Sequence, residues 1–579
     1  MQRTSAVRLR SVVFRSCFTT PSSWRALIQR CQPTVGVKCL LSWSKIDADL
    51  TKLRVSARML VTMLFAVASA VNAAGDFPLL DAARNQDQQK ISTLLSQHAD
   101  VNVRSKDGST PLLWAAHWGD VKTTDLLLRA GADPNAANDF RMTPLSQACV
   151  NGSAALVELL LKAGANPNTP IATGETPLMT CSKTGSADAV QALIAHDAAI
   201  NAKEPSQNQT ALMWAAAERH PDVVKMLIDA KADLQARTKS GFSALHFAAR
   251  EGDQESVRLL LAAGVSVNIL VQPNGAEKGK AGGAETAGSS SGGAVAGGAS
   301  AGGGSAGAVA RGGGRNVATA GYTPLLVATV RGQVELALFL LNQGADPNVG
   351  DAGFTPLHWA VATWENGTSN PVYGFEDAMS GIPDRQAKLR LVKALLAHAA
   401  DPNARMKKRP PLAGGYTDVA GATPFLLASS VDDVEMMRIL QAAGADPKLL
   451  TASNATPIMA ATGLNHLVGE SAVTEAQAIN AVKYLLDLGL DPKGATIFGE
   501  NALFGPAYRG WNTLLAQLID LGVDVNAVSK AGLTPWLAAS GKGDRLGGVL
   551  YNQEGADLLL KHGANPDLGH ACLAQTKCK

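Results

Sequence analysis

A helix-opening signal recurs along this chain at a nearly constant interval, and this period constrains the fold more than any other feature. The first five openings are 33, 33, 34 and 33 residues apart, and later spacings include 32 and 33. The eleven openings are Thr110, Thr143, Thr176, Thr210, Ser243, Thr323, Thr355, Thr423, Thr456, Asn501 and Thr534. Self-similarity at such a period predicts stacked repeats rather than one globular core.

Each repeat is predicted to contain two helices. Thr or Ser at the opening can act as the N-cap, and Pro usually follows at the first helical position. Gly119 ends one such first helix, and the apolar run at 121–128 forms the second. The Gly-Ala-Asp-Pro-Asn segment at 131–135 ends that helix, because Gly adopts the left-handed conformation and Pro cannot continue a helix. Residues 77–108 have the same pattern without the opening signal, which predicts an N-terminal capping repeat and twelve repeats in all.

Residues 355–360 read Thr-Pro-Leu-His-Trp-Ala, which resembles the T-P-L-H-x-A motif of the ankyrin repeat. The resemblance extends over nearly all of 76–568, and the chain resembles bacterial exported ankyrin-repeat proteins. It implies an all-α ankyrin-repeat solenoid of about twelve helix-turn-helix repeats. It also implies a chain that binds other proteins and is not an enzyme.

The period breaks between Ser243 and Thr323, where Gly, Ala and Ser fill the sequence from about 274 to 318. Such a composition cannot bury a core and predicts a flexible linker between two ankyrin blocks. The alternative is that the segment loops out while the flanking repeats still stack. The predicted organisation is an unstructured or upstream segment at 1–58, a signal peptide at 59–74, block one at 75–270, the linker at 271–320, block two with loop insertions at 321–568 and a tail at 569–579.

Residues 59–74 have the three parts of a secretory signal: a basic flank from Lys52 to Arg58, an apolar stretch and the small-residue ending Val-Asn-Ala at 71–73. The apolar stretch is shorter than the ~20 residues of a membrane span. We expect a periplasmic or secreted protein without a stable membrane span; the alternative is anchoring by an uncleaved N-terminal segment. Residues 1–58 are either upstream of the true start or an Arg- and Ser-rich extension of the organellar-transit kind.

Charge separates the N-terminal segment from the repeats. Residues 1–73 contain eleven Lys or Arg and two acidic residues, whereas the remainder contains 41 basic and 47 acidic residues. A mildly acidic repeat array argues against nucleic acid as its partner. We therefore expect a protein partner rather than nucleic acid. We also expect the chain to be a monomer.

The cysteines fit more than one compartment. Cys149 and Cys181 occupy small-residue positions of first helices and are predicted to be buried thiols. Cys572 and Cys578 either close a small disulfide loop in an oxidising compartment or lie in an unpaired tail.

Two sequence patterns that are typical of catalytic or nucleotide-binding sites match this chain only because one segment is rich in Gly and Ser. Residues 288–292 satisfy G-x-S-x-G and residues 302–307 satisfy G-x-G-x-x-G, but both lie in the Gly-rich segment, with no preceding strand and no following helix. Metal-ligand spacings are missing from the sequence. We expect no catalytic residues, no cofactor and no metal site.

Several conspicuous side chains are predicted to be structural. His246 and His358 occupy the His position of the motif and should form local hydrogen bonds. The position four residues after the opening is expected to pack in the core, and it carries an aromatic in four repeats: Trp114, Trp214, Phe247 and Trp359. Pro506 falls inside the first helix expected after Asn501, which makes that repeat irregular.

Insertions distinguish the second block, at about 364–384, 406–421, 464–475 and 541–552. Insertions in repeat proteins map to loops and often to the binding face, although neutral drift in tolerant turns is the alternative. Aromatic residues and Arg dominate binding hot spots. The predicted partner-binding residues are Trp364, Tyr373, Phe375, Arg409 and Tyr416. The expected function is a non-enzymatic protein-interaction scaffold; the alternative is an accessory or inhibitory subunit of a specific enzyme or toxin.

Overall fold

The computed structural model describes residues 77–272, 320–362, 382, 384–408, 420–464, 473–541 and 551–569. These residues form 24 helices and no strands, with one isolated bridge between Ala495 and Asn501. The predicted all-α class is confirmed. None of the described helices is long and apolar enough to cross a membrane.

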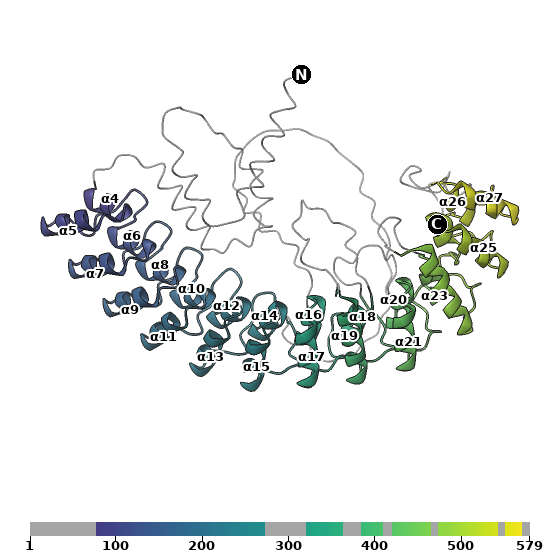
Figure 1. Ribbon diagram of the computed structural model, residues 1–579, viewed down its shortest axis with the longest axis horizontal. Coiled ribbons are helices and arrows are strands. Elements are labelled where there is room, and N and C mark those ends of the chain that lie inside the picture. The colour runs from purple at the N-terminus through teal and green to yellow at the C-terminus, as the bar shows by residue number, and fades with distance from the viewer. Residues whose placement is uncertain are drawn as a thin grey trace, which may run out of the picture. The chain divides into compact units, whose positions relative to one another are not determined.

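The helices form twelve consecutive pairs (Figure 1). The first helices are α4 (Pro78–Arg84), α6 (Pro111–Trp118), α8 (Pro144–Val150), α10 (Pro177–Thr184), α12 (Ala211–Ala217), α14 (Ala244–Glu251), α16 (Pro324–Val330), α18 (Pro356–Val361), α20 (Pro424–Ser430), α22 (Pro457–Ala461), α24 (Phe504–Arg509) and α26 (Pro535–Ala539). The second helices are α5 (Gln88–Ser96), α7 (Val121–Arg129), α9 (Ala154–Lys162), α11 (Ala187–Ala195), α13 (Pro221–Asp229), α15 (Gln254–Ala262), α17 (Val334–Asn342), α19 (Arg385–Ala397), α21 (Val434–Ala442), α23 (Glu475–Asp487), α25 (Asn512–Asp520) and α27 (Gln553–Lys561). We call the turn within a pair the intra-repeat turn and the segment that joins one pair to the next the inter-repeat turn.

The predicted caps begin and end the first helices. The Thr110 hydroxyl accepts a hydrogen bond from the Leu113 amide at 3.2 Å, and Thr323 accepts from the Leu326 amide at 3.1 Å. Gly119 adopts a left-handed φ of 74° at the end of α6. The same Thr cap is found at Thr143, Thr176, Thr210, Thr355, Thr423, Thr456 and Thr534.

The repeat after Asn501 differs from the expected pattern. Its first helix, α24, begins at Phe504, so Asn501 is not the N-cap and Pro506 lies in the first turn, where Pro is tolerated. Gly505 lies against the preceding repeat, because a Cβ there would be 2.0 Å from the Thr462 carbonyl oxygen. A glycine at this position therefore permits the close approach of the two backbones.

An asparagine at the end of many repeats ties each repeat to the next. Asn135 donates from Nδ2 to the Gly164 carbonyl at 3.0 Å and accepts from the Asn166 amide at 2.7 Å. The same pair of bonds is made by Asn102, Asn168, Asn348, Asn403 and Asn526. These bonds satisfy a carbonyl at the end of the neighbouring second helix, where no intrahelical partner exists.

We expect Asn135→Ala to destabilise the third repeat by about 1–2 kcal/mol, because it removes two inter-repeat hydrogen bonds. Lys448 occupies the same place in its repeat but has no acceptor atom, so Lys448→Ala serves as the control and should have little effect. Urea unfolding of the two variants measures the difference. Equal midpoints would show that the asparagine bonds do not contribute to stacking.

The repeats on either side of residues 273–319 stack on each other, contrary to the expectation of two separate blocks. Helices α14 and α16 are in contact. The Val271 amide donates to the Tyr322 carbonyl at 2.9 Å, and the Gly321 amide donates to the Val271 carbonyl at 2.9 Å. Because the chain leaves and re-enters at one inter-repeat turn, the intervening sequence does not separate the helix pairs on either side of it.

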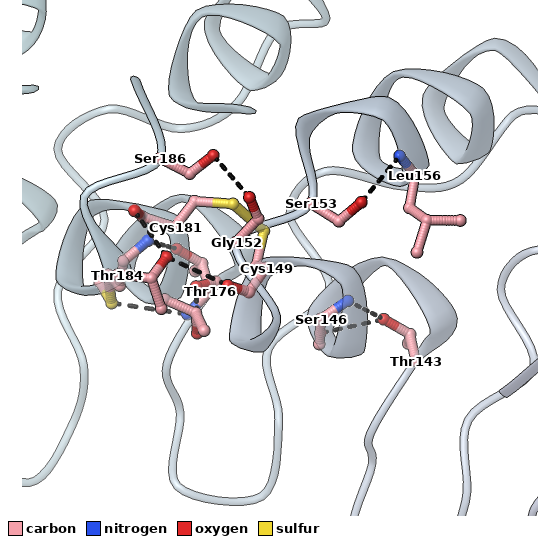
Figure 2. Close-up of a disulfide and its surroundings, with 12 residues drawn as sticks. Thr143, Ser146, Cys149, Gly152, Ser153, Leu156, Thr176, Cys181, Thr184 and Ser186 are labelled. Carbon is pink, nitrogen blue, oxygen red and sulfur yellow. Dashed lines mark hydrogen bonds between the residues drawn. A yellow bond between two sulfur atoms is a disulfide. The ribbon is translucent and has the colours of Figure 1, made fainter. Parts of the chain in front are cut away.

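Cys149 and Cys181 form a disulfide, so the prediction of buried thiols was wrong (Figure 2). Cys149 lies six residues after its repeat opening and Cys181 five residues after the next, and these small-residue positions face each other with Cα atoms 4.6 Å apart. Two hydrogen bonds flank the bridge, from the Thr184 hydroxyl to the Cys149 carbonyl and from the Ser186 hydroxyl to the Gly152 carbonyl. The third and fourth repeats are therefore linked covalently as well as by packing.

Candidate functional site

All five predicted partner-binding residues lie outside the described residues. Trp364, Tyr373 and Phe375 belong to the insertion between α18 and α19, and Arg409 and Tyr416 belong to the insertion between α19 and α20. Cys572 and Cys578 also lie outside. The residues at the two ends of each insertion are described, and they show how each insertion is attached to the repeats.

The insertion between α18 and α19 begins and ends at an intra-repeat turn. The Lys388 ammonium donates to the carbonyl of Ala362, the last described residue before the insertion, at 2.9 Å. Asp384, at the end of the insertion, caps α19 by accepting from the Gln386 amide at 2.9 Å. Burial lowers the pKa of Lys388, and the nearby charge of Asp433 opposes that shift.

An ion-pair network crosses from α19 to α21 beside this attachment. Arg385 donates to both oxygens of Asp433, at 2.6 and 3.0 Å, and to Glu435 at 2.7 Å. Burial alone would raise the pKa of Asp433, but the Arg385 hydrogen bonds, the Met436 amide and the charges of Arg385 and Lys388 together hold that pKa below its usual range. The same bonds raise the pKa of Arg385. A bidentate guanidinium–carboxylate pair of this kind fixes the start of α19 relative to the next repeat.

A cavity of about 410 Å³ opens at the same edge, in front of the intra-repeat turns that follow α14 and α16. Its lining includes Gly252, Gly332, Gln333, Glu335, Asp384 and Arg390. Arg390 is already paired with Glu335. The lining offers amides and carboxylates but no Ser, Cys or His, so it can recognise a polar group and has none of these common nucleophiles.

The insertion between α19 and α20 is attached at the opposite edge of the array, at an inter-repeat turn. The Met406 amide donates to the Ala422 carbonyl at 2.9 Å, and the Gly421 amide donates to the Met406 carbonyl at 2.7 Å. Val271, Gly321 and Tyr322 make the same pair of bonds around residues 273–319. The two insertions that carry the predicted residues therefore begin at different edges of the array.

Asp432 is a buried carboxyl group that the sequence reasoning missed. It occupies the place where other first helices end in Gly, and its φ of 53° is left-handed, a conformation that Asp tolerates better than most residues. The side chain is 8 % exposed, and its Oδ1 makes no hydrogen bond within the described part of the chain. Burial raises its pKa to about 8, against the opposing charge of Arg509. An Asp in place of the regular Gly is the sequence signal that could have identified it.

Comparison with known families gives matches over most of the described repeats. Models described as ankyrin repeats in three copies match residues from 57 to 270 in overlapping segments, and the single ankyrin-repeat model matches 320–352 and 352–407. Together these segments cover more than half of the chain. The chain belongs to the ankyrin-repeat family.

Three individual proteins are similar to parts of this chain. Protein PhlB of Serratia liquefaciens is 32 % identical over 153 residues, which are 26 % of this chain and 47 % of PhlB. Inversin of Danio rerio is 42 % identical over 66 residues, 11 % of this chain and 6 % of Inversin. The crystal structure of the human ASB11 ankyrin repeat domain is 29 % identical, covers 33 % of this chain and 85 % of that domain, and has a TM-score of 0.30. The chain thus spans less than half the length of the two curated relatives.

The residues of the ankyrin motif are structural, as predicted. His358 shares a hydrogen bond with the Thr355 hydroxyl at 2.8 Å, and its other ring nitrogen lies 3.0 Å from the Ala404 carbonyl oxygen. Burial lowers the pKa of His246 to about 3 and that of His358 to about 4, so both rings are neutral at physiological pH. The aromatic row packs in the core: Trp114, Phe247 and Trp359 are buried and Trp214 is half-buried against it.

The described residues show no arrangement typical of a metal centre. No three side chains of His, Cys, Asp or Glu among them lie together where they could hold a metal ion. Their conspicuous polar features are instead the attachments of the insertions, the cavity and the buried Asp432. Surfaces of this kind can recognise a partner.

Proposed function

We propose that this chain is an exported, non-enzymatic scaffold that binds a protein partner through the insertions of its second half. Ankyrin repeats are protein-interaction modules. The observation that carries the proposal is the pair of fixed attachments at Lys388 and Met406, which hold the ends of two aromatic-bearing insertions. A surface whose supports are ordered before binding loses less conformational entropy when the partner arrives.

The partner test uses the exported chain, beginning near Ala74, as bait. A captured protein is titrated against the wild type and against Trp364→Ala, Tyr373→Ala and Arg409→Ala. We expect each substitution at a hot spot to weaken binding by about 2 kcal/mol, with unchanged thermal melting. Phe140→Ala, which removes an exposed aromatic from an early repeat, is the control.

Unchanged affinity in all three variants would show that the insertions are not part of the binding site. The partner also decides between the two functional alternatives. If it is an enzyme or toxin whose activity changes on binding, the chain is an accessory or inhibitory subunit rather than a general scaffold.

Export is supported by the pattern at 59–74 and by the Cys149–Cys181 disulfide, since structural disulfides persist mainly in oxidising compartments. We expect N-terminal sequencing of the mature protein to begin near Ala74, with the protein in the periplasm or the medium. A chain that begins at Met1 or Met59 in the cytosolic fraction would exclude cleavage and export. A Met59 start in the membrane fraction would instead indicate an uncleaved anchor.

A further inference from the structure

The last inter-repeat turns expose large apolar side chains. Leu450 between α21 and α22 is 36 % exposed, Ile497 and Phe498 between α23 and α24 are 48 % and 42 % exposed, and Val528 between α25 and α26 is 40 % exposed. We call these four residues the apolar tip row. Large apolar side chains that gather on the surface of a folded protein often mark a binding site.

The turns that carry the row are hydrogen-bonded to one another. The Ile497 amide donates to the Ser453 carbonyl at 2.8 Å, and the Lys530 amide donates to the Phe498 carbonyl at 2.7 Å. Within the middle turn, the Thr496 amide donates to the Glu500 carbonyl at 2.8 Å. Three successive turns therefore lie side by side and present their side chains in a fixed order.

Earlier inter-repeat turns have a different surface. Their exposed residues are mostly polar: Lys106, Asp139, Arg141, Thr173, Ser206, Gln207, Lys239 and Ser240. Phe140 is a single large apolar residue at 63 % exposure, and it stands between Asp139 and Arg141. Among the described residues, neighbouring inter-repeat turns that each expose a large apolar side chain are thus found in the last repeats.

Basic side chains accompany the row. The Lys530 ammonium lies 5.8 Å from the centre of the Phe498 ring. Lys407 and Lys408 are exposed in the preceding inter-repeat segment, beside Gly353. Residues 450–455, 495–501 and 527–533 form the tips of these turns, and Glu500 is the one carboxylate among them and is only partly exposed. Asp446, Asp491 and Asp524 lie nearer the second helices.

We propose that the apolar tip row docks on an anionic lipid bilayer, with the apolar side chains in the interface and the lysines against the headgroups. Protruding apolar groups with flanking cations suit a soft anionic surface, where apolar insertion and electrostatic attraction add. An added peptide strand is disfavoured, because the Ile497 and Lys530 amides already have backbone partners.

The test measures co-sedimentation of the exported chain with phosphatidylcholine vesicles, with and without phosphatidylglycerol. We expect binding only to the anionic vesicles, and weaker binding at higher ionic strength. The double substitution Ile497→Ser and Phe498→Ser should reduce the vesicle partition coefficient at least about tenfold. Lys530→Glu should reduce it less.

Phe140→Ser is the matched control, because it also removes an exposed aromatic from an inter-repeat turn but leaves the row intact. Circular dichroism melting checks that the variants remain folded. Absence of vesicle binding, or equal losses in the control and the double variant, would overturn the proposal. The proposal would also be overturned if the double variant still bound vesicles but no longer captured a protein partner. That result would make the apolar tip row a protein-docking surface. The insertion variants that lose the protein partner should still bind vesicles. Failure of the proposed partner site can therefore be distinguished from failure of the proposed vesicle site.

Discussion

Removal of the Cys149–Cys181 disulfide is expected to destabilise the third and fourth repeats by about 3–4 kcal/mol, from the closure of a 32-residue loop. The suitable variant replaces both cysteines with Ala, because Ala116 and Ala148 fill the equivalent first-helix positions one repeat earlier. This replacement leaves small apolar groups at the interface and removes only the covalent bond and two sulfur atoms. Urea unfolding, followed by hydrogen exchange of α8 and α10, measures the effect.

Dithiothreitol provides the control. It should shift the wild-type unfolding midpoint downward and leave the double Ala variant unchanged, which separates this bridge from any effect at Cys572 and Cys578. Identical midpoints for oxidised and reduced wild type would contradict a stabilising role. Because ankyrin repeats interact with nearest neighbours, the loss should be largest near the bridge and fade toward the last repeats.

The second large effect is expected at Asp432. Its folded-state pKa of about 8 lies above the value of about 4 for an unfolded Asp, so the folded state retains a proton that the unfolded state loses. Stability is therefore fully present below pH 4 and decreases as pH rises from about 4 to 8. Asp432→Asn cannot ionise and still tolerates the left-handed backbone. We expect it to be more stable than wild type by about 2–5 kcal/mol at pH 9, with little difference at pH 4.

Hydrogen exchange of α20 and α21 across this pH range reports the local opening directly. Asp487→Asn, at an exposed position at the end of α23, is the control and should not reproduce the pH-dependent difference. Parallel pH profiles for wild type and Asp432→Asn would mean that Arg509 and local relaxation keep the carboxylate charged.

The sequence predicted the helix pairs well because their signals are local. Thr110 and Thr323 cap their helices, and Gly119 ends one, because of the residues next to them in the sequence. Asn501 matched the repeat interval and was wrongly predicted to open a first helix. That helix begins at Phe504, so Pro506 lies in its first turn, where the missing amide hydrogen is tolerated.

Features that depend on two repeats together were harder to predict. The Cys149–Cys181 bridge requires knowing that two positions, six and five residues after successive openings, face each other. The stacking of α14 on α16 requires knowing that Val271 and Gly321 meet at a single turn. The composition of an intervening segment predicts its character, but it does not predict which residues of the repeats hold the two ends of that segment.

The candidate site was predicted only in outline. Insertion boundaries near 364–384 and 406–421 agree with the attachments at Ala362, Asp384, Met406 and Gly421. Their aromatic residues remain a prediction. The buried Asp432 and the apolar tip row were missed, since both appear only when residues of one repeat are compared with the equivalent residues of the others.

The paired backbone bonds between Val271, Gly321 and Tyr322 also matter for protein engineering. They make the turn between the sixth and seventh repeats a natural graft point, where a reporter domain or an epitope could replace residues 273–319 without altering the spacing of the helices. In evolutionary terms, such a turn lets a lineage gain or lose sequence by recombination while selection on the stacked interfaces continues unchanged.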